Sequence, residues 1–336
     1  MKKLVYIGNR LSQKGRTVTS IETLGNALAK EGYSVTMASD RHNKVLRLLD
    51  MLWVVFKHRK TTDYVLIDTY STLNFYYAFL VGTLCRILKL NYLPILHGGN
   101  LPNRLEVSPG LSKALFKNAY CNICPSPYIY EAFKTMGYKN LTVIPNTISI
   151  EQYPCVVKCI DAPKMLWVRS LADIYNPEMA IRVLHQLKQK GYEAELCMVG
   201  PDKDNMMRAL VDLAESLNVC VDFKGKLSKA AWIQLSKQYN IFINTTHFDN
   251  MPVSVIEAMA LGFLVVSTRV GGIPYLIQDG ANGLLVDDGN TKQMVNKITT
   301  LIETPMLVSQ LSKQARATAM TFNWQQVKDK WHQILK

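Results

Sequence analysis

Short runs of β-branched and other apolar residues alternate along the first half of the chain with longer segments of helical periodicity. Six runs have the length and composition of strands: "KLVYIG", "SVTMAS", "DYVLID", "NYLPILH", "CNICPS" and "LTVIPN". The helical patterns between them lie near residues 18–30, 43–58, 72–89, 109–118 and 127–136. This alternation predicts βαβ units and a parallel sheet covered by helices on both faces.

The same pattern restarts after a connector, "CVVKCIDAPK". Six further runs read as strands: "KMLWVRS", "AELCMVG", "VDFKGK", "IFINTT", "FLVVST" and "GLLVDD". Beyond about residue 291 the chain is helical, and its last segment, "FNWQQVKDKWHQILK", has the pattern of an amphipathic helix. We expect an α/β protein with two doubly wound, Rossmann-like domains facing across a cleft, 1–152 and 153–320, which leaves 321–336 as a terminal helix.

Length and composition are consistent with two cores. The chain has 336 residues, of which 48% are hydrophobic. The longest apolar region, residues 71–90, contains Asn74, Arg86 and Lys89, so we expect a buried helix there and no membrane span. Seven cysteines without an export signal favour free thiols in a reducing cytoplasm. "CNIC" reads as a buried strand with no histidine at a zinc-site spacing, so we expect no metal.

The formal net charge of +13 implies an anionic partner. Much of the charge lies in "RHNKVLRLLDMLWVVFKHRK", residues 41–60, which combines basic residues with Leu, Trp and Phe in a helical pattern. Two interpretations stay open: a helix that lies on an anionic membrane, or a surface helix with one face on its own core. No nucleic-acid recognition motif accompanies the charge, so we do not expect a nucleic-acid partner.

Ligands of open parallel sheets bind at the carboxyl ends of the strands. One stretch directly after a predicted strand, "HFDNMPVSVIEAMALG", carries Asp249 and Glu257 around Ser254. Ser254 and Glu257 have the spacing of a capping box, and Gly262 is a typical helix end. The start of such a helix is a phosphate site. Each acid has an alternative reading, Asp249 as a turn residue and Glu257 as part of the cap.

Other candidates also follow predicted strands. Arg169 comes after the first strand of the second half, where a guanidinium can neutralise a diphosphate. His97 precedes two glycines in "LHGGN" and is expected to face a ligand more than the core. Gly8 and Gly15 in "IGNRLSQKGR" allow close backbone approach, although the spacing is not that of the dehydrogenase fingerprint.

Three more strand-end loops contribute to the expected site. "MVGPD" contains Gly200 and "FKGKLS" contains Lys226, and both are candidates for the walls of a base pocket. "VGGIP", residues 270–274, opens a short predicted helix with two glycines and is a candidate anion nest.

Taken together, these motifs resemble the family-4 retaining glycosyltransferases of the GT-B fold. The resemblance covers essentially the whole chain. It rests on "GNRLSQKG", "HGGN", "VIPNTI" and "VRSL", and above all on "DNMPVSVIEAMALGFLVVSTRVGGIPYLIQDGANGLLVDDG". The terminal "FNW" and its helix resemble the segment that crosses back to the first domain in this fold.

The resemblance implies transfer of a sugar from a nucleotide-diphosphate donor, without a metal or other cofactor and with retention at the anomeric carbon. By position, Glu257 holds the donor ribose and Asp249, in place of the usual first Glu, contacts sugar hydroxyls. Arg169 and the helix starting near Val255 stabilise the departing diphosphate. His97 lies beside the transferred sugar, and the loop from Gly8 to Gly15 against the phosphates. Two further donor-binding residues are expected in the same run, Asn250 and Ser254.

Three departures from the family pattern are visible. No lysine follows Arg169, where the chain reads Ile174, Tyr175 and Asn176, so Lys226 is a candidate for the missing charge. Asp249 is shorter than the usual Glu, and Arg16 replaces a second glycine.

Alternatives therefore remain beside a glycosyltransferase. They are a nucleotide-sugar epimerase of the same fold and a weakly active or non-catalytic membrane-associated member. For the glycosyltransferase we expect a glycan or lipid-linked acceptor, as in bacterial surface polysaccharide or lipopolysaccharide synthesis. Its expected location is the cytoplasm, peripheral on the inner face of the cell membrane.

Overall fold

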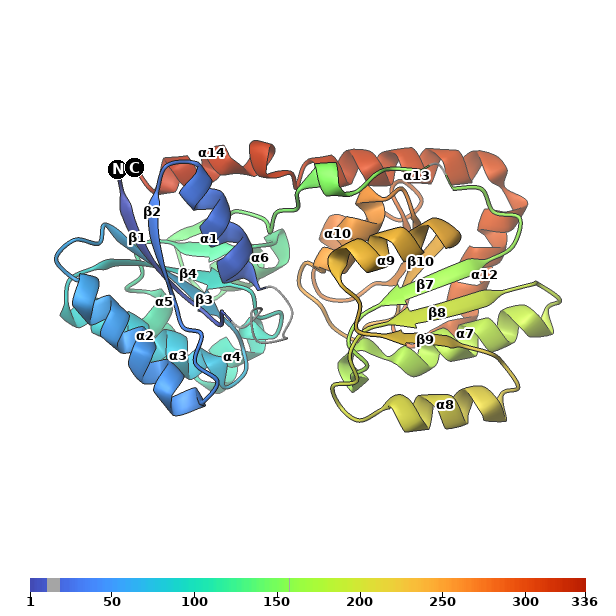
Figure 1. Cartoon of the computed structure of the whole chain (residues 1–336), viewed down its shortest axis with the longest axis horizontal. Helices are drawn as coiled ribbons and strands as arrows, with labels where there is room; N and C mark the ends of the chain where they lie inside the picture. The colour runs from blue at the N-terminus through green and yellow to red at the C-terminus, as the bar shows by residue number, and fades with distance from the viewer. Residues whose placement is uncertain (11–18, 157) are drawn as a thin grey trace. The chain divides into compact units, whose positions relative to one another are not determined.

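The computed structural model describes residues 1–10, 19–156 and 158–336 and divides the chain into two compact units (Figure 1). The first unit comprises Met1–Thr147 and Trp324–Lys336, and the second comprises Ile148–Asn323. The sequence places its boundaries slightly later in the chain at the first junction and slightly earlier at the second. Each unit is built on a six-stranded parallel sheet.

The first unit's sheet has the strand order β2-β1-β3-β4-β5-β6. Its strands are β1 (Lys3–Ile7), β2 (Ser34–Ala38), β3 (Tyr64–Thr69), β4 (Asn91–Leu96), β5 (Asn122–Cys124) and β6 (Leu141–Val143). The helices between them are α1 (Ser20–Lys30), α2 (Lys44–His58), α3 (Asn74–Ile87), α4 (Leu101–Val107), α5 (Pro109–Phe116) and α6 (Pro127–Thr135). The strand order changes direction between β1 and β3.

Both faces of this sheet are buried because successive strand residues point to opposite sides. Val5 and Ile7 pack with residues of α2 to α6, whereas Leu4 and Tyr6 pack with α1 and the chain end. The end is helix α14 (Trp324–Ile334), whose Val327 contributes to the second of these layers. The terminal helix therefore completes the first unit. Its first residue is tied to the end of α1 by a hydrogen bond from Trp324 Nε1 to Glu31 (3.0 Å).

The second unit's sheet has the order β12-β11-β10-β7-β8-β9. Its strands are β7 (Lys164–Val168), β8 (Glu195–Val199), β9 (Asp222–Gly225), β10 (Ile241–Asn244), β11 (Leu264–Thr268) and β12 (Leu284–Val286). Its α-helices are α7 (Pro177–Gln189), α8 (Met207–Ser216), α9 (Lys229–Leu235), α10 (Val253–Ala260), α11 (Ile273–Leu276), α12 (Thr291–Glu303) and α13 (Pro305–Met320). Short 3-10 turns lie at Ile150–Gln152, Asp173–Tyr175 and Ser236–Gln238. Numbered from β7, this is the Rossmann order 3-2-1-4-5-6, whose direction changes between β7 and β10.

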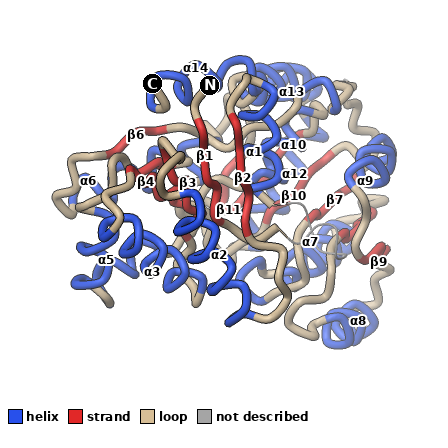
Figure 2. The backbone as a smooth tube through the Cα atoms, turned by 60° about the vertical axis from the view of Figure 1, so that its left-hand side comes forward, coloured by secondary structure: helices blue, strands red, loops and turns tan. Residues whose placement is uncertain are grey.

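Two apolar layers sandwich this second sheet as well. Met165 and Trp167 face a layer that includes α7, α8 and α12, while Leu166 and Phe242 face a layer that includes α9, α10 and α11. Figure 2 shows the strands of each unit flanked by helices.

The predicted strands all form, and the α/β architecture with two Rossmann-like sheets is confirmed. The sequence pattern missed one helix, α4, because it follows directly on the "HGGN" turn and has only 7 residues. The apolar region at 71–90 forms α3, which buries Phe75 and Val81. None of the helices in the part of the chain that the structure describes has the length and apolar character needed to cross a membrane.

Helix α2 is apolar on two opposite sides. Met51 and Val55 are buried in the sheet-facing layer, and Arg47 is also buried, with its guanidinium hydrogen-bonded to Asn9 and to the segment before the helix. The outer side nevertheless exposes large apolar side chains, each between 42% and 65% accessible: Val45, Leu46, Leu49, Trp53 and Phe56. A core-covering role accounts only for the inner side of this helix.

Candidate functional site

In the second unit, the candidate residues gather where the strand order changes direction. Arg169 directly follows β7, and Asp249 lies in the loop after β10, the neighbouring strand. Loops that leave two such strands diverge and open a crevice at the carboxyl edge of the sheet. The site therefore lies where this fold class binds its ligands.

Arg169 and Asp249 form an ion pair. Their side chains are mostly buried, and the guanidinium also lies over the ring of Tyr175, 4.7 Å from its centroid. The backbone N–H of Asn250 donates to Asp249 Oδ1 at 2.8 Å. Arg169 Nε is buried and has no hydrogen-bond partner among the described residues, so one donor of this guanidinium is unsatisfied. The structure thus brings Arg169 and Asp249 together and holds the arginine on an aromatic face.

Glycines allow the surrounding loops to approach closely. A side chain at Gly200 would lie 1.6 Å from the backbone oxygen of Arg169, so only glycine lets the loop after β8 pass there. A side chain at Gly272 would lie 1.8 Å from the backbone oxygen of Asn250, and the Gly272 N–H donates to Asp249 O at 2.9 Å. The "VGGIP" glycines therefore support the Asp249 loop from behind, a packing role that the anion-nest interpretation did not include.

Helix α10 begins differently from the prediction. Its N-cap is Pro252, no side chain caps it, and Ser254 lies inside the first turn. Ser254 Oγ is buried and has no partner within the described ranges. The capping box of Ser254 and Glu257 is therefore wrong, because the helix starts too early for Ser254 to occupy the cap. The predicted end is right: the helix stops at Leu261, and Gly262 has a φ of 80°.

The uncapped start of α10 leaves polar groups available. The first N–H groups of a helix have no intrahelical partner, and here no capping side chain replaces one. The N–H of Val255 is already used, because it donates to Pro252 O at 3.1 Å, and the Val255 side chain is buried. The backbone N–H groups that remain for a ligand are therefore those of Val253 and Ser254. An unpartnered hydroxyl beside free N–H groups at the positive end of a helix suits an anion.

Glu257 lies on the same helix and is almost fully buried. Its Oε1 accepts a hydrogen bond from Tyr153 Oη at 2.8 Å and pairs with Lys229 Nζ. Burial and the nearby carboxylate of Glu257 raise the pKa of Tyr153, so its hydroxyl remains a donor. The Lys229 ammonium also lies 5.9 Å from the centroids of the Tyr153 and Trp232 rings.

Sequence reasoning missed both of these partners of Glu257. Lys229 is the first residue of α9, directly behind its N-cap Ser228. Lys229 brings a positive charge to Glu257. Lys226, which the sequence suggested for the missing charge, lies exposed in the loop before α9. Tyr153 directly follows the 3-10 turn at Ile150–Gln152, before the connector, where no motif marks it.

In the first unit, His97 turns toward a buried acid, Asp68, at the end of β3. His97 Nε2 lies 2.9 Å from Asp68 Oδ1, and Tyr6 Oη donates to the same oxygen at 2.8 Å. The imidazole stacks on Tyr70, and only 8% of the His97 side chain is accessible. Burial, and then the charge of Asp68, raise the pKa of both tyrosines, which therefore stay protonated. Sequence reasoning also missed Asp68, although it ends the predicted strand run "DYVLID".

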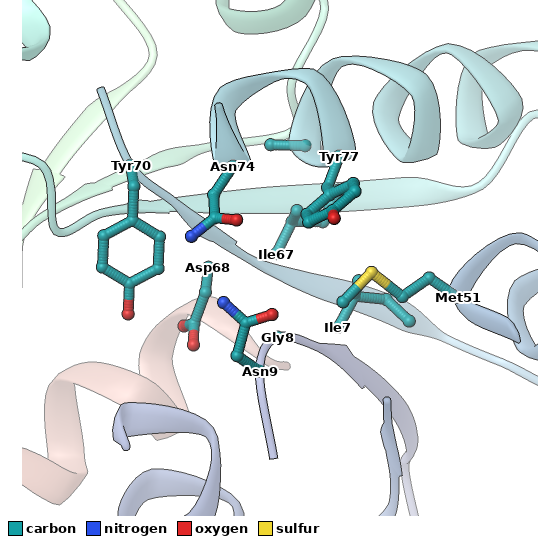
Figure 3. Close-up of a pocket in the computed structure, with 10 residues that line it drawn as sticks. Ile7, Gly8, Asn9, Met51, Ile67, Asp68, Tyr70, Asn74 and Tyr77 are labelled. Atoms are coloured by element: carbon teal, nitrogen blue, oxygen red, sulfur yellow. The ribbon is translucent and has the colours of Figure 1, made fainter. Parts of the chain in front are cut away.

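Gly8 and Asp68 lie together in a small pocket at the carboxyl ends of β1 and β3 (Figure 3). A side chain on Gly8 would lie 2.6 Å from Asp68 Oδ2, so this glycine makes room for a carboxylate. Gly15 and Arg16 lie outside the described residues. No group of three or more metal-binding side chains occurs in the described part of either unit.

Comparison with known families finds a match for the region that holds the Arg169 and Glu257 cluster. Residues 160–318 match the family model of the glycosyl transferases group 1. This matched region lies within the second unit. Among curated proteins, the chain is 22% identical to an uncharacterized glycosyltransferase of Haemophilus influenzae over all of both chains. It is 24% identical to the lipopolysaccharide core biosynthesis glycosyltransferase LpsE of Rhizobium meliloti, over 70% of this chain and 68% of the relative.

Solved structures share the fold over the whole chain, which confirms the GT-B class. Sucrose-phosphate synthase from Thermosynechococcus elongatus has a TM-score of 0.81 at 18% identity, covering 99% of this chain and 98% of its own. Anabaena HepE in complex with UDP and glucose has a TM-score of 0.79 at 19% identity, covering 100% and 99%. The lipopolysaccharide outer core galactosyltransferase WaaB has a TM-score of 0.73 at 15% identity and covers 99% of each chain.

Proposed function

We propose that this protein is a retaining, family-4 type glycosyltransferase that moves a sugar from a nucleotide-diphosphate donor to a glycan or lipid-linked acceptor. The observation that carries the proposal is the arrangement in the second unit. Arg169, the uncapped start of α10 and the Glu257–Lys229 pair lie at the carboxyl edge of one Rossmann-like sheet, inside the glycosyltransferase domain. Nothing in the comparisons supports the epimerase alternative.

Positive charge for the leaving group is available without the usual lysine after Arg169. Arg169 supplies a guanidinium with an unpartnered Nε, and the start of α10 supplies N–H groups and the Ser254 hydroxyl. Lys229 adds a third positive group next to Glu257. Preorganised charges of this kind stabilise the oxygen charge that develops on a departing diphosphate. The missing lysine therefore does not argue for an inactive member.

In the proposed reaction the bond between the anomeric carbon and the phosphate oxygen breaks as the acceptor oxygen approaches the same face of the sugar. The acceptor oxygen then bonds the anomeric carbon, and its proton passes to the departing phosphate oxygen. Arg169 and the α10 start stabilise the diphosphate during bond cleavage. Glu257 accepts hydrogen bonds from the donor ribose, and Asp249 both holds Arg169 and contacts the transferred sugar.

The donor test starts with UDP-sugars because structures of HepE, a fold relative, contain UDP and UDP-glucose. Isothermal titration of UDP, UDP-glucose and a panel of other nucleotide sugars into the full-length protein measures binding. We expect at least one ligand to bind, and Arg169→Ala and Glu257→Ala each to weaken binding about tenfold or more. The matched control is Arg182→Ala, which removes only an exposed pair with Glu178 on α7. Absence of binding to every nucleotide tested would contradict the proposal.

We further propose that the acceptor is presented at an anionic membrane surface, to which residues 41–60 attach the protein. The outer side of α2 exposes Leu46, Leu49, Trp53 and Phe56, spaced so that they form one stripe along the helix. Arg59 lies 4.0 Å from the Phe56 ring centroid, so positive charge borders the stripe.

The neighbouring helix α3 extends this surface. It packs against α2 and exposes Tyr76, Leu80 and Ile87 on its own outer side. Residues 41–60 contain six Lys or Arg and one acid, and residues 71–90 contain two Lys or Arg and no acid. A surface that is both apolar and basic fits the interface of an anionic bilayer, where apolar side chains enter the headgroup boundary and cations contact lipid phosphates.

A membrane position suits one class of product. LpsE and WaaB, which resemble this chain, are named for lipopolysaccharide core synthesis. We therefore propose a role in bacterial surface polysaccharide or lipopolysaccharide synthesis, at the cytoplasmic face of the cell membrane.

A further inference from the structure

The first unit contains a second site of change in strand order, between β1 and β3. Asp68 is the penultimate residue of β3 at this point, next to Gly8 and Asn9, which follow β1. Tyr70 and Asn74, from the loop after β3 and the start of α3, complete the polar wall of the pocket in Figure 3. The pocket therefore occupies the position at which open α/β sheets bind ligands.

The hydrogen bonds of Asp68 account for only one of its two oxygens. Its side chain is 1% accessible, and Oδ1 interacts with both Tyr6 and His97. Oδ2 is buried and has no hydrogen-bond partner among the residues that the structure describes. A buried carboxylate oxygen without a donor is unfavourable, so folded proteins retain one where a ligand or water supplies the donor.

A purely structural role does not explain this arrangement. Orienting the His97 imidazole requires one oxygen, and Oδ1 does that. Gly8 keeps the space in front of Oδ2 open, because a side chain there would lie 2.6 Å from it. The sequence thus maintains both the buried charge and the access to its second oxygen.

We infer that Asp68 Oδ2 accepts a hydrogen bond from one hydroxyl group that a sugar, bound at the mouth of this pocket, inserts into it. A carboxylate repels anions and disfavours apolar groups, whereas a neutral polyol offers the missing donor. In Figure 3 the side-chain amide of Asn9 lies beside the Asp68 carboxylate and that of Asn74 lies above it, and both amides can bind neighbouring hydroxyls. The open volume is only about 10 Å³, which admits one hydroxyl-sized group and excludes a whole sugar ring.

The inference rests on the proposed function, which supplies the sugar: it is either the acceptor or the sugar that is transferred from the donor. Both present the same hydroxyl chemistry. His97 lies next to this contact, and its imidazole is held in place by Asp68 Oδ1.

The test compares Asp68→Asn with a control from the same cluster, Tyr6→Phe, in the full-length protein. Saturation-transfer NMR with methyl glycosides measures the acceptor-like sugars. Isothermal titration with UDP and UDP-glucose measures the donor. Thermal melts establish that each variant is folded.

We expect Asp68→Asn to weaken the binding of one sugar class about tenfold or more, and Tyr6→Phe to change it less than about threefold. A loss confined to methyl glycosides assigns the contact to the acceptor. A loss for UDP-glucose but not for UDP assigns it to the transferred sugar. Both results support the inference.

A second measurement stands even if Asp68→Asn fails to fold. Wild-type protein is titrated with methyl glycosides and UDP-glucose analogues that each lack one hydroxyl, and removal of one particular hydroxyl should cost about tenfold or more. Nucleotide-sugar binding that is unchanged in Asp68→Asn, with no methyl glycoside bound by the wild type, overturns the inference and leaves the proposed function intact. If the protein binds no nucleotide but still binds methyl glycosides in an Asp68-dependent way, the proposed function is contradicted and the inference about Asp68 stands.

Discussion

At the scale of single residues, Ser254 separates two accounts of how α10 works. A capping serine stabilises its helix by accepting a backbone N–H, whereas this serine lies in the first turn with no partner among the described residues. Its buried hydroxyl adds nothing to the stability of the helix by that route. The arrangement therefore favours a ligand-binding role at the start of α10.

Replacing Ser254 by Ala tests this reading. We expect a change in the free energy of unfolding below about 0.5 kcal/mol, because no cap is lost. Nucleotide-diphosphate binding should weaken about fivefold to tenfold, because one hydrogen bond to the anion disappears. Urea denaturation and isothermal titration measure the two quantities. A stability loss of about 1 kcal/mol with unchanged affinity would restore the capping interpretation.

The rule that ligands lie at strand ends selects Arg169 and Asp249 directly, and the structure brings these two side chains together. It did not predict Lys229 or Tyr153, which reach Glu257 from a different helix and from the segment before the connector. Their contribution depends on how α9 and that segment pack on α10, which no local spacing encodes. Asp68 could have been found by the same rule, since it ends the run "DYVLID".

At the scale of elements, α2 is the helix whose pattern the fold alone does not explain. Its inner side covers the sheet, and its outer side exposes an apolar stripe bordered by positive charge. The sequence left two readings open, a membrane helix or a core-covering helix. The structure shows the core contacts and leaves the outer stripe available for the membrane that we propose.

Charge placed in the stripe should prevent membrane attachment. Leu49→Glu combined with Trp53→Glu is expected to reduce binding to phosphatidylglycerol-containing vesicles roughly tenfold or more in a flotation assay at low salt. The matched control is Met306→Glu, which introduces the same charge at an exposed apolar position of the second unit.

Vesicles of phosphatidylcholine alone should bind the wild type weakly, because the cations then lack anionic lipid. A wild-type protein that does not float with anionic vesicles would contradict the membrane proposal. The membrane proposal would also be contradicted if the wild type formed a dimer and the Leu49→Glu, Trp53→Glu variant did not, because a second copy of the chain would then cover the stripe.

At the scale of the whole molecule, the architecture was predictable because its signals are repetitive. Each strand run ends in a turn or a functional loop, and two successive sets of six runs predict two sheets. Helix α4 was not predictable because it is short and begins within a glycine turn. The start of α10 was misplaced because Pro252 serves as its N-cap in place of a serine, which the capping-box pattern favoured.

One buried charge links the stability of the second unit to pH. Lys158, in the connector, donates to Ser236 O at 3.0 Å, and burial lowers its pKa from 10.5 to about 8. Between these values the unfolded chain keeps a proton that the folded protein releases, so stability rises with pH. Below pH 8 the lysine is charged in both states and the full cost of burial is present.

The free energy of unfolding should therefore increase between pH 7 and pH 9.5 by about 1–2 kcal/mol more in the wild type than in Lys158→Met. Urea denaturation of both proteins at the two pH values measures these changes in the free energy of unfolding. Other titrating groups contribute equally to both proteins, so their effect cancels in the comparison. Parallel pH dependences in the two proteins would show that Lys158 does not titrate in this range.

The central claim is that the second unit's cluster catalyses sugar transfer, and the rate of transfer tests it most directly. The donor selected by titration is incubated with a membrane-lipid acceptor fraction, and sugar incorporation is followed for wild type, Arg169→Ala, Glu257→Ala and the Arg182→Ala control. We predict that the first two variants lower turnover by roughly 10²-fold or more while the control retains the wild-type rate. Near-wild-type transfer by both Arg169→Ala and Glu257→Ala would contradict the account.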